Sequence, residues 1–347
     1  MRLSILDQSP IISGHTPTQA IRETIELARA ADRLGYHRYW LAEHHAMKGL
    51  ADPCPEILLG QVAAATERIR VGTGGVLLPY YSPLKVAEVF RMYEALFPGR
   101  IDLGIGRAPG GTRLLAQAMN AEAFGAEERF PVQVQEMVGY LNDAFPADYP
   151  YHEVKAMPSG ATIPEIWLLG SSDYSGSLAA YLGLRFSFAH FISAHGGPSV
   201  ARAYRHHFRS VYRDERPCSM VAVFVICADA QDQAERLAAS IDLRRLQMSR
   251  GEEQPIATTD QALSLPLDEG ERAIIRRERA RAVVGTPASV KTRLLELQEE
   301  FLADEVMVIT ITGDYASRLH SYELLADVFA LDEAAHAHPT SRTGDCP

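Results

Sequence analysis

Hydrophobic and polar positions along the chain follow two rhythms that together predict eight strand–helix units. Short apolar runs rich in β-branched and aromatic residues predict strands, and longer stretches with apolar positions every three or four residues predict helices. The predicted strands are Leu3–Leu6, Arg38–Leu41, Ile69–Thr73, Arg100–Ile105, Ile166–Leu169, Arg185–Ala189, Met220–Cys227 and Glu305–Thr312. The helices that follow them are Thr18–Leu34, Pro55–Thr66, Pro83–Phe97, Val132–Phe145, Ser172–Leu182, Ser199–Tyr212, Asp232–Met248 and Tyr315–Phe329.

Strictly alternating units of this kind favour the α/β fold class and a parallel sheet. Because about eight units close such a sheet, we expect a (β/α)8 TIM barrel. An open doubly wound sheet is the main rival and more often stops at about five to seven strands.

Two segments interrupt the rhythm. Residues 249–284 are rich in charge and lie after the seventh predicted strand, so we expect an insertion near the catalytic end of the barrel. A mobile lid over the substrate and a solvated excursion without a role are both open. Residues 333–347 are expected to form a disordered tail, which leaves a single domain over residues 1–332.

Composition excludes several functional classes. The 347 residues carry a formal charge of -10 and no basic stripe, which argues against nucleic-acid binding. No apolar run is long enough to span a membrane and the first residues lack the pattern of a signal peptide, so we expect a cytoplasmic protein. The four cysteines, Cys54, Cys218, Cys227 and Cys346, form no CxxC pair and indicate reduced thiols.

Polar residues and glycines gather where the predicted strands end, which is where barrel enzymes place their chemistry. These positions are Asp7-Gln8-Ser9, Glu43-His44-His45, Gly74-Gly75, Arg107, Ser171-Ser172 and His190. The sequence therefore predicts that the six strand ends form one pocket.

Arg107 and the Gly170-Ser171-Ser172 segment are the candidates for binding an anion. A guanidinium presents a planar fork to phosphate oxygens, although a lone arginine is more often part of a surface salt bridge. Ser171 and Ser172 open a predicted helix, where a serine caps the helix and free N–H groups attract a phosphate, and both roles can coexist. Pro109 stands where a dinucleotide-binding GxGxxG motif needs its third glycine, so no Rossmann fingerprint is present.

His44 is the candidate for acid–base chemistry or hydrogen bonding. Adjacent residues at a strand end face opposite ways, so His44 and His45 are not expected to share a metal, and His45 fits a structural role. Gly74 and Gly75 permit either close approach of a ligand to the backbone or a tight turn before Pro79. His190 could place an imidazole beside a flat ring or could belong to the core. No metal site is expected.

Three motifs resemble the bacterial-luciferase-like monooxygenases, most of all their stand-alone, single-chain subgroup. They are WLAEHH at Trp40–His45, VGTGGVLLPYYSPLKVAE at Val71–Glu88 and FPGRIDLGIGRAPGG at Phe97–Gly111. The similarity is dense over residues 1–111 and returns at residues 166–172, 188–193 and 284–301.

This resemblance implies a (β/α)8 fold that binds FMN without a covalent bond, usually as a homodimer formed by the helices after the second and third strands. By likeness, Arg107, Ser171 and Ser172 hold the FMN phosphate. Gly74-Gly75 corresponds to the place where the family often has a non-proline cis peptide against the flavin ring. His44 corresponds to the catalytic histidine, and Glu43 to a neighbouring residue of the site.

The resemblance also implies a reaction. Reduced FMN (FMNH2), supplied by a separate flavin reductase, reacts with O2 at C4a to give a peroxide or hydroperoxide, and one oxygen atom passes to a small organic substrate by epoxidation, hydroxylation or Baeyer–Villiger chemistry. The composition, rather than the resemblance, suggests a role in secondary metabolism. Two alternatives stay open: hydride transfer with a deazaflavin (F420), whose longer anionic tail calls for more basic residues, and a non-catalytic flavin-binding protein.

Overall fold

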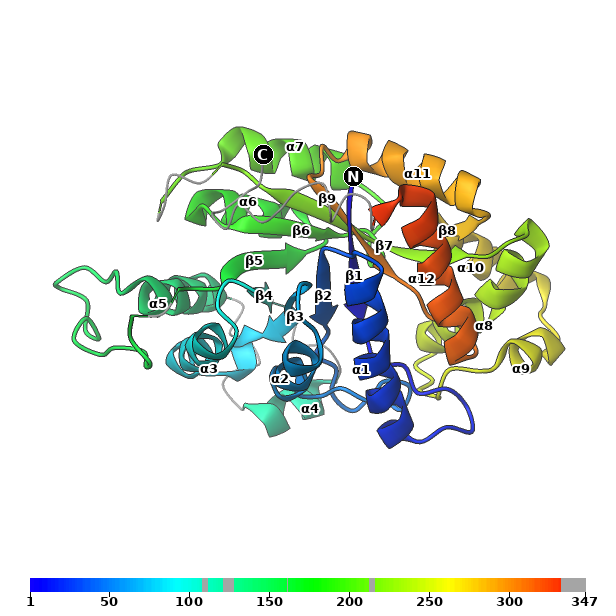
Figure 1. Cartoon of the computed structure of the whole chain (residues 1–347), viewed down its shortest axis with the longest axis horizontal. Helices are drawn as coiled ribbons and strands as arrows, with labels where there is room; N and C mark the ends of the chain where they lie inside the picture. The colour runs from blue at the N-terminus through cyan, green and yellow to red at the C-terminus, as the bar shows by residue number, and fades with distance from the viewer. Residues whose placement is uncertain (108–111, 121–127, 161, 212–215, 332–347) are drawn as a thin grey trace.

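All of the strands but β8 close into one parallel barrel in the computed structural model, which describes residues 1–107, 112–120, 128–160, 162–211 and 216–331 (Figure 1). The hydrogen-bonded order is β6-β5-β4-β3-β2-β1-β9-β7, and a pairing between β6 and β7 completes the ring. The strands are β1 (Arg2–Asp7), β2 (Arg38–Leu41), β3 (Arg70–Leu77), β4 (Ile101–Gly106), β5 (Glu165–Gly170), β6 (Arg185–Ala189), β7 (Ser219–Cys227), β8 (Ala282–Gly285) and β9 (Glu305–Ile309). The predicted (β/α)8 barrel is confirmed, and the open sheet is excluded.

Helices surround the barrel (Figure 1), and several of them begin at a residue whose side chain caps the helix. Thr16 accepts the N–H of Gln19 ahead of Pro17, and Ser82 accepts the N–H of Lys85 ahead of Pro83. The helices are α1 (Pro17–Arg33), α2 (Pro55–Ala65), η1 (Leu78–Tyr80), α3 (Pro83–Leu96), α4 (Arg113–Met119), α5 (Phe130–Asn142), α6 (Asp173–Leu182), α7 (Gly197–His207), α8 (Gln231–Ser249), α9 (Thr259–Ser264), α10 (Glu269–Glu278), η3 (Arg279–Arg281), α11 (Pro287–Glu300) and α12 (Tyr315–Phe329).

Two strands differ from the expectation. Strand β3 continues through its glycines to Leu77, with a register shift against β4 between Thr73 and Val76. Strand β8 pairs with the end of β7 outside the ring and falls within the predicted insertion and just beyond it. Strand β8 has only four residues and follows a charged segment. Four residues are too few for a hydrophobic period to be recognised in the sequence.

The insertion after β7 contains α9 and α10, which pack beside α8 (Figure 1). Its backbone is also joined to the loop after β1, because Ile256 donates to the Ile11 carbonyl at 2.8 Å and accepts from Ser13 at 2.7 Å. Movement of this segment as a lid stays a prediction. The tail predicted at residues 333–347, Pro109 and Cys346 lie outside the described residues. None of the described helices is long and apolar enough to cross a membrane.

Side chains alternate between two apolar layers along each strand. Those facing the helices form the larger core, whereas those inside the barrel, such as Leu6, Trp40 and Met307, form a second cluster. Helix α8 adds its apolar residues to the inner cluster, so this helix extends the barrel interior beyond the carboxyl ends of the strands. The candidate site has to be built at this end.

Candidate active site at the carboxyl ends of the strands

Glu43 joins the end of β2 to the end of β3. Its buried carboxylate accepts the Leu77 N–H at 2.8 Å and the Tyr81 hydroxyl at 2.7 Å, and it lies 2.6 Å from His45 Nε2. Burial and this carboxylate raise the pKa of Tyr81 well above its usual value, so the phenol remains a hydrogen-bond donor. Because these contacts use both oxygens, Glu43 holds the glycine segment of β3 in place.

The peptide bond between Gly74 and Gly75 is cis, as the family resemblance leads us to expect. A Cβ atom on Gly74 would lie 2.5 Å from Leu6 Cδ1, and one on Gly75 would lie 2.6 Å from the Gly104 carbonyl oxygen. Neither position therefore accepts a larger residue without movement of its neighbours. The segment is a close approach between adjacent strands and not a turn before Pro79.

His44 presents an unused ring nitrogen. Its backbone N–H donates to the Asp52 carbonyl at 3.0 Å, its ring hydrogen bonds the Ala42 backbone, and the buried Nδ1 has no partner among the described residues. Burial lowers the pKa of His44 to about 4, and the positive charge of Arg244 acts in the same direction. The imidazole is therefore neutral at pH 7, and Nδ1 is free to receive a proton or a hydrogen bond.

His45 contacts a different set of groups from His44, in line with the predicted opposite orientation. It pairs with Glu43, and its ring meets the edge of Tyr80 with centroids 6.0 Å apart. Within the part of the chain that the structure describes, no group of three His, Cys, Asp or Glu side chains could hold a metal ion.

Asp52 is a buried carboxyl that sequence reasoning missed. One oxygen accepts the Cys54 N–H at 3.0 Å, and the other, Oδ2, has no partner among the described residues. Burial raises the pKa of Asp52 to about 7, although the bond from Cys54 opposes the shift. Its setting in Ala51-Asp52-Pro53 is typical of an ordinary turn, so the sequence carries no signal for this environment.

The structure brings Arg107 to the first turn of α6. The Arg107 guanidinium lies 4.4 Å from the centroid of the Tyr174 ring, and it forms no salt bridge within the described ranges. Ser172 occupies the N-cap position of α6, but its side chain makes no capping hydrogen bond. The capping role expected for this serine is therefore wrong, and its hydroxyl is available to a ligand.

Gly170 explains how α6 comes so near to β5. A Cβ atom at Gly170 would lie 2.1 Å from Ser175 Oγ, so only glycine lets the helix start against the strand end. Arg107, Tyr174, Ser171 and Ser172 thus belong to one corner of the site, where free N–H groups and a guanidinium can meet an anion.

Asp7 and Ser9 do not join this site, contrary to the predicted single pocket. Leu6 faces the barrel interior, so Asp7 faces the helices, where it is fully buried. It accepts Arg318 Nη2 at 2.6 Å, the Ser9 N–H at 2.7 Å and the Tyr39 hydroxyl. Burial disfavours the charged carboxylate, but the combined effect of Arg318 and these hydrogen bonds is larger, so the pKa of Asp7 is lowered. The group is structural.

His190 also lies apart from the other candidates. Its ring meets Phe301 edge-on at 5.7 Å, and it hydrogen bonds the Ala280 backbone. The strand alternation that turns Phe188 toward the helices turns His190 the same way, while Phe191 joins the inner cluster beside Phe224. Cofactor binding by His190 is therefore not supported by its position.

The family follows from comparison with known proteins. The profile of a family described as luciferase-like monooxygenase matches residues 1–304. The chain belongs to this family. Membership identifies it as a flavin-dependent monooxygenase, which agrees with the resemblance of the three sequence motifs.

Three similar proteins illustrate how far the likeness extends. This luciferase-like monooxygenase is 39% identical to a luciferase-like monooxygenase of Escherichia coli K12, over 94% of this chain and 96% of that protein. It is 34% identical to the N-acetyl-S-alkylcysteine monooxygenase of Bacillus subtilis 168, over 94% and 98%. The crystal structure of apo-MsnO8 superposes with a TM-score of 0.86 at 37% identity, covering 95% of this chain and 98% of that one.

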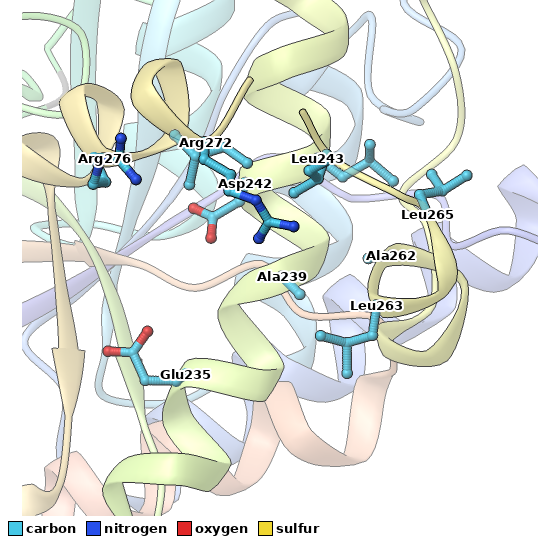
Figure 2. A pocket seen from close by; sticks show the side chains of 11 residues that line it. Glu235, Ala239, Asp242, Leu243, Ala262, Leu263, Leu265, Arg272 and Arg276 are labelled. Carbon is cyan, nitrogen blue, oxygen red and sulfur yellow. The ribbon is translucent and has the colours of Figure 1, made fainter. Parts of the chain in front are cut away.

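A groove of about 410 Å³ lies between α8, α9 and α10, and none of the candidate residues lines it (Figure 2). Glu235, Ala239 and Asp242 line it from α8, and α9 and α10 supply leucines and arginines such as Leu263 and Arg272. Asp242 is already paired with Arg279 at 2.6 Å. The groove is therefore separate from the candidate site of this monooxygenase.

Proposed function

We propose that this monooxygenase accepts reduced FMN from a separate flavin reductase and transfers one oxygen atom of O2 to a small organic substrate. The observation that carries the proposal is His44, which offers a buried Nδ1 without a partner among the described residues, on the same sheet as the cis Gly74–Gly75 segment and the Arg107 corner. The missing Rossmann fingerprint fits an oxygenase that receives its flavin already reduced.

The residues present fit FMN. Arg107, Ser171 and Ser172 would hold the phosphate, because the guanidinium is without a salt bridge within the described residues and the Ser172 hydroxyl caps no N–H. Gly74 and Gly75 would receive the ring system, since neither residue carries a side chain that would stand between the ring and the backbone of β3. Glu43 would act as a positioning residue that keeps these glycines in place.

Reduced FMN supplies the electrons that activate O2 when it is bound. The chain supplies proton handling and exclusion of water. His44 holds its ring against the Ala42 backbone and offers Nδ1 to a proton, while its low pKa prevents permanent protonation. The apolar interior built from Trp40, Trp167 and Leu6 keeps water from the reacting atoms.

The deciding test is the replacement of His44 by Ala in an assay with reduced FMN, 18O-labelled O2 and N-acetyl-S-alkylcysteines, which the Bacillus subtilis relative makes the first substrates to try. We expect FMN affinity to stay within about twofold and oxygenated product to fall at least about a hundredfold, with hydrogen peroxide released instead. His152→Ala, at an exposed loop position, is the control. An unchanged product yield in His44→Ala would remove the catalytic assignment.

A cofactor screen separates FMN from the deazaflavin alternative. We expect FMN to quench the protein fluorescence at lower concentration than F420, because Arg107 is the one basic side chain that the described residues are seen to bring to the first turn of α6, and the longer anionic tail calls for more. Tighter binding of F420 would favour hydride transfer. Binding of FMN without labelled product from any substrate would favour a non-catalytic flavin protein.

We further propose a homodimer through α2 and α3. Ile57 is 68% exposed on α2, and Met92 and Leu96 are 50% and 60% exposed on α3. Exposed large apolar side chains on two helices that share the Tyr93–Glu56 contact are typical of an interface. Light scattering should give twice the chain mass for the wild type and the single chain mass for Leu96→Glu.

A further inference from the structure

Helix α8 carries arginines where its inner face should be apolar. Four residues spaced three or four apart turn toward the barrel interior: Ala234, Leu237, Ala238 and Ile241. The next positions of this stripe are Arg244 and Arg245, which are only 7% and 8% exposed. A buried pair of guanidiniums therefore extends the apolar stripe at the carboxyl end of the barrel.

Arg244 lies against the loop that carries His44. A Cβ atom on Gly49 would lie 2.3 Å from Arg244 Nη1, so the guanidinium fills the space that glycine leaves open. The positive charge also reaches His44, whose pKa it helps to lower. The chain has thus made room for an arginine beside the proposed catalytic histidine.

Arg245 lies over an aromatic ring that packs against the inner cluster. Its guanidinium is 4.7 Å from the centroid of Phe224, and Nη1 donates to the Glu278 carbonyl at 3.1 Å. The buried Nη2 has no partner among the described residues. Burial, assisted by Arg281, lowers the pKa of Arg245 to about 10, as expected for a cation without a counterion.

No carboxylate balances the two charges. In the described ranges neither arginine forms a salt bridge, and neither has an unstated contact. The acidic groups that act on them from a distance are Glu253 for Arg244 and Asp242 for Arg245, and Asp242 is paired with Arg279. Burying an unpaired charge is strongly unfavourable, so such a pair persists where a ligand supplies the missing anion.

We propose that Arg244 and Arg245 bind the anionic head group, a carboxylate or a sulfonate, of the organic substrate. A guanidinium binds these planar or threefold oxygen groups through paired hydrogen bonds, and Phe224 and Phe191 offer apolar surface to the rest of the molecule. The FMN phosphate has a separate place at Arg107 and α6. The proposal rests on the proposed function, because it assigns a substrate to that same site.

The test is calorimetric titration of FMN-loaded protein with benzoate and benzenesulfonate, with benzamide as the neutral isostere. We expect saturable binding of the anions, at least about tenfold weaker binding of benzamide, and at least about tenfold loss of anion affinity in Arg244→Gln and Arg245→Gln. Arg244→Lys should retain part of the anion affinity that Arg244→Gln loses. Arg236→Gln is the matched control, because this arginine is on the same helix but is 61% exposed.

A second readout follows His44 directly. Bound benzoate should raise the pKa of His44 measured by NMR in the wild type, and the rise should vanish in Arg244→Gln. Equal affinity for benzoate and benzamide, no saturable anion binding, or full anion binding by both variants would overturn the proposal. Loss of FMN affinity relative to riboflavin in Arg244→Gln would overturn it too, since the guanidinium would then serve the cofactor phosphate.

The outcomes keep this proposal distinct from the proposed function. Labelled product from uncharged substrates, together with no anion binding, would support the proposed oxygenase function and contradict only the proposal that the substrate has an anionic head group. Failure of the wild type to bind FMN removes the proposed function itself.

Discussion

The two ends of the barrel bury arginines in opposite ways. At the amino end, Arg38 is 2% exposed, and its guanidinium bonds Glu305 at 3.0 Å, Asp102 at 2.9 Å and Glu165 at 2.8 Å. At the carboxyl end, Arg244 is 7% exposed and has no salt bridge within the described residues. The same side chain at similar burial is fully paired at one end and unpaired at the other.

This difference in pairing distinguishes a structural arginine from one that we propose binds a ligand. The carboxylates around Arg38 stand at or next to the first residues of β4, β5 and β9, so the network joins strands that are distant in sequence. Such a network satisfies its own charges and needs no ligand. The carboxyl end leaves His44 Nδ1, Asp52 Oδ2 and Arg245 Nη2 without partners among the described residues, and two of these atoms belong to the residues that we propose act on the flavin and the substrate.

The largest effect is expected from Arg38→Met. Removing the cation leaves the buried Glu305 without its arginine and Asp102 with Arg70 alone, which should lower the free energy of unfolding by about 3–5 kcal/mol. Urea denaturation measures this loss of stability. Arg29→Met is the control, because Arg29 pairs with Glu26 at the surface and its replacement should change the free energy of unfolding by less than about 1 kcal/mol. Equal losses in the two variants would mean that the buried network does not hold the amino end together.

The next effect is the pH dependence contributed by two groups of the carboxyl end, His44 and Asp52. The pKa of His44 falls to about 4 on folding, so between pH 6.5 and 4 the unfolded state binds the extra proton and stability drops as the pH falls. The pKa of Asp52 rises to about 7, so over much of the same window its folded form keeps a proton and stability increases as the pH falls. The two contributions oppose each other in the wild type.

Single variants should separate these two contributions. Between pH 7 and 4, His44→Gln should gain about 3 kcal/mol of stability relative to the wild type, and Asp52→Asn should lose stability relative to it. Glu305 and Glu165 beside Arg38 act at lower pH, because Arg38 lowers the pKa of both carboxyls and their contribution to stability disappears only as the pH falls below about 4.5. Parallel stability curves for the wild type and both variants would refute the assignment.

A smaller effect concerns the third arginine of the carboxyl end. Arg107→Gln should weaken FMN about tenfold and riboflavin much less, because a charge-assisted hydrogen bond to phosphate is lost. Arg209→Gln is a matched control: Arg209 stacks on Tyr181 at 5.1 Å, near the other end of α6. Equal weakening of FMN and riboflavin by Arg107→Gln would contradict the phosphate role.

The sequence predicted the barrel well because period and order are local properties. The strand Arg38–Leu41 and the helix Tyr315–Phe329 have the predicted bounds. Strand β8 was missed, since four residues within a charged segment carry no readable period. The His44, Gly74–Gly75 and Arg107 positions follow from their place after strands, which the fold class fixes once the barrel is recognised.

The errors in the site come from the direction of side chains. Asp7 and His190 stand at strand ends like His44, yet the alternation of side chains along a strand turns both toward the helices. A shift of one residue in the strand decides whether a side chain faces the site or the helices. Arg244 was missed for a different reason. It belongs to a helix rather than a strand end, and only its spacing of three from Ile241 on the inner face marks it in the sequence.

The smallest effect, and the one that most sharpens the contrast between the two ends, is expected from Arg244→Met. Since no carboxylate loses a partner, the free energy of unfolding should change by less than about 1 kcal/mol or increase, as replacement of a buried charge by an apolar side chain often stabilises. Arg38→Met provides the paired comparison in the same denaturation series. A loss as large as that of Arg38→Met would mean that Arg244 has a structural partner and is no recipient for a substrate anion.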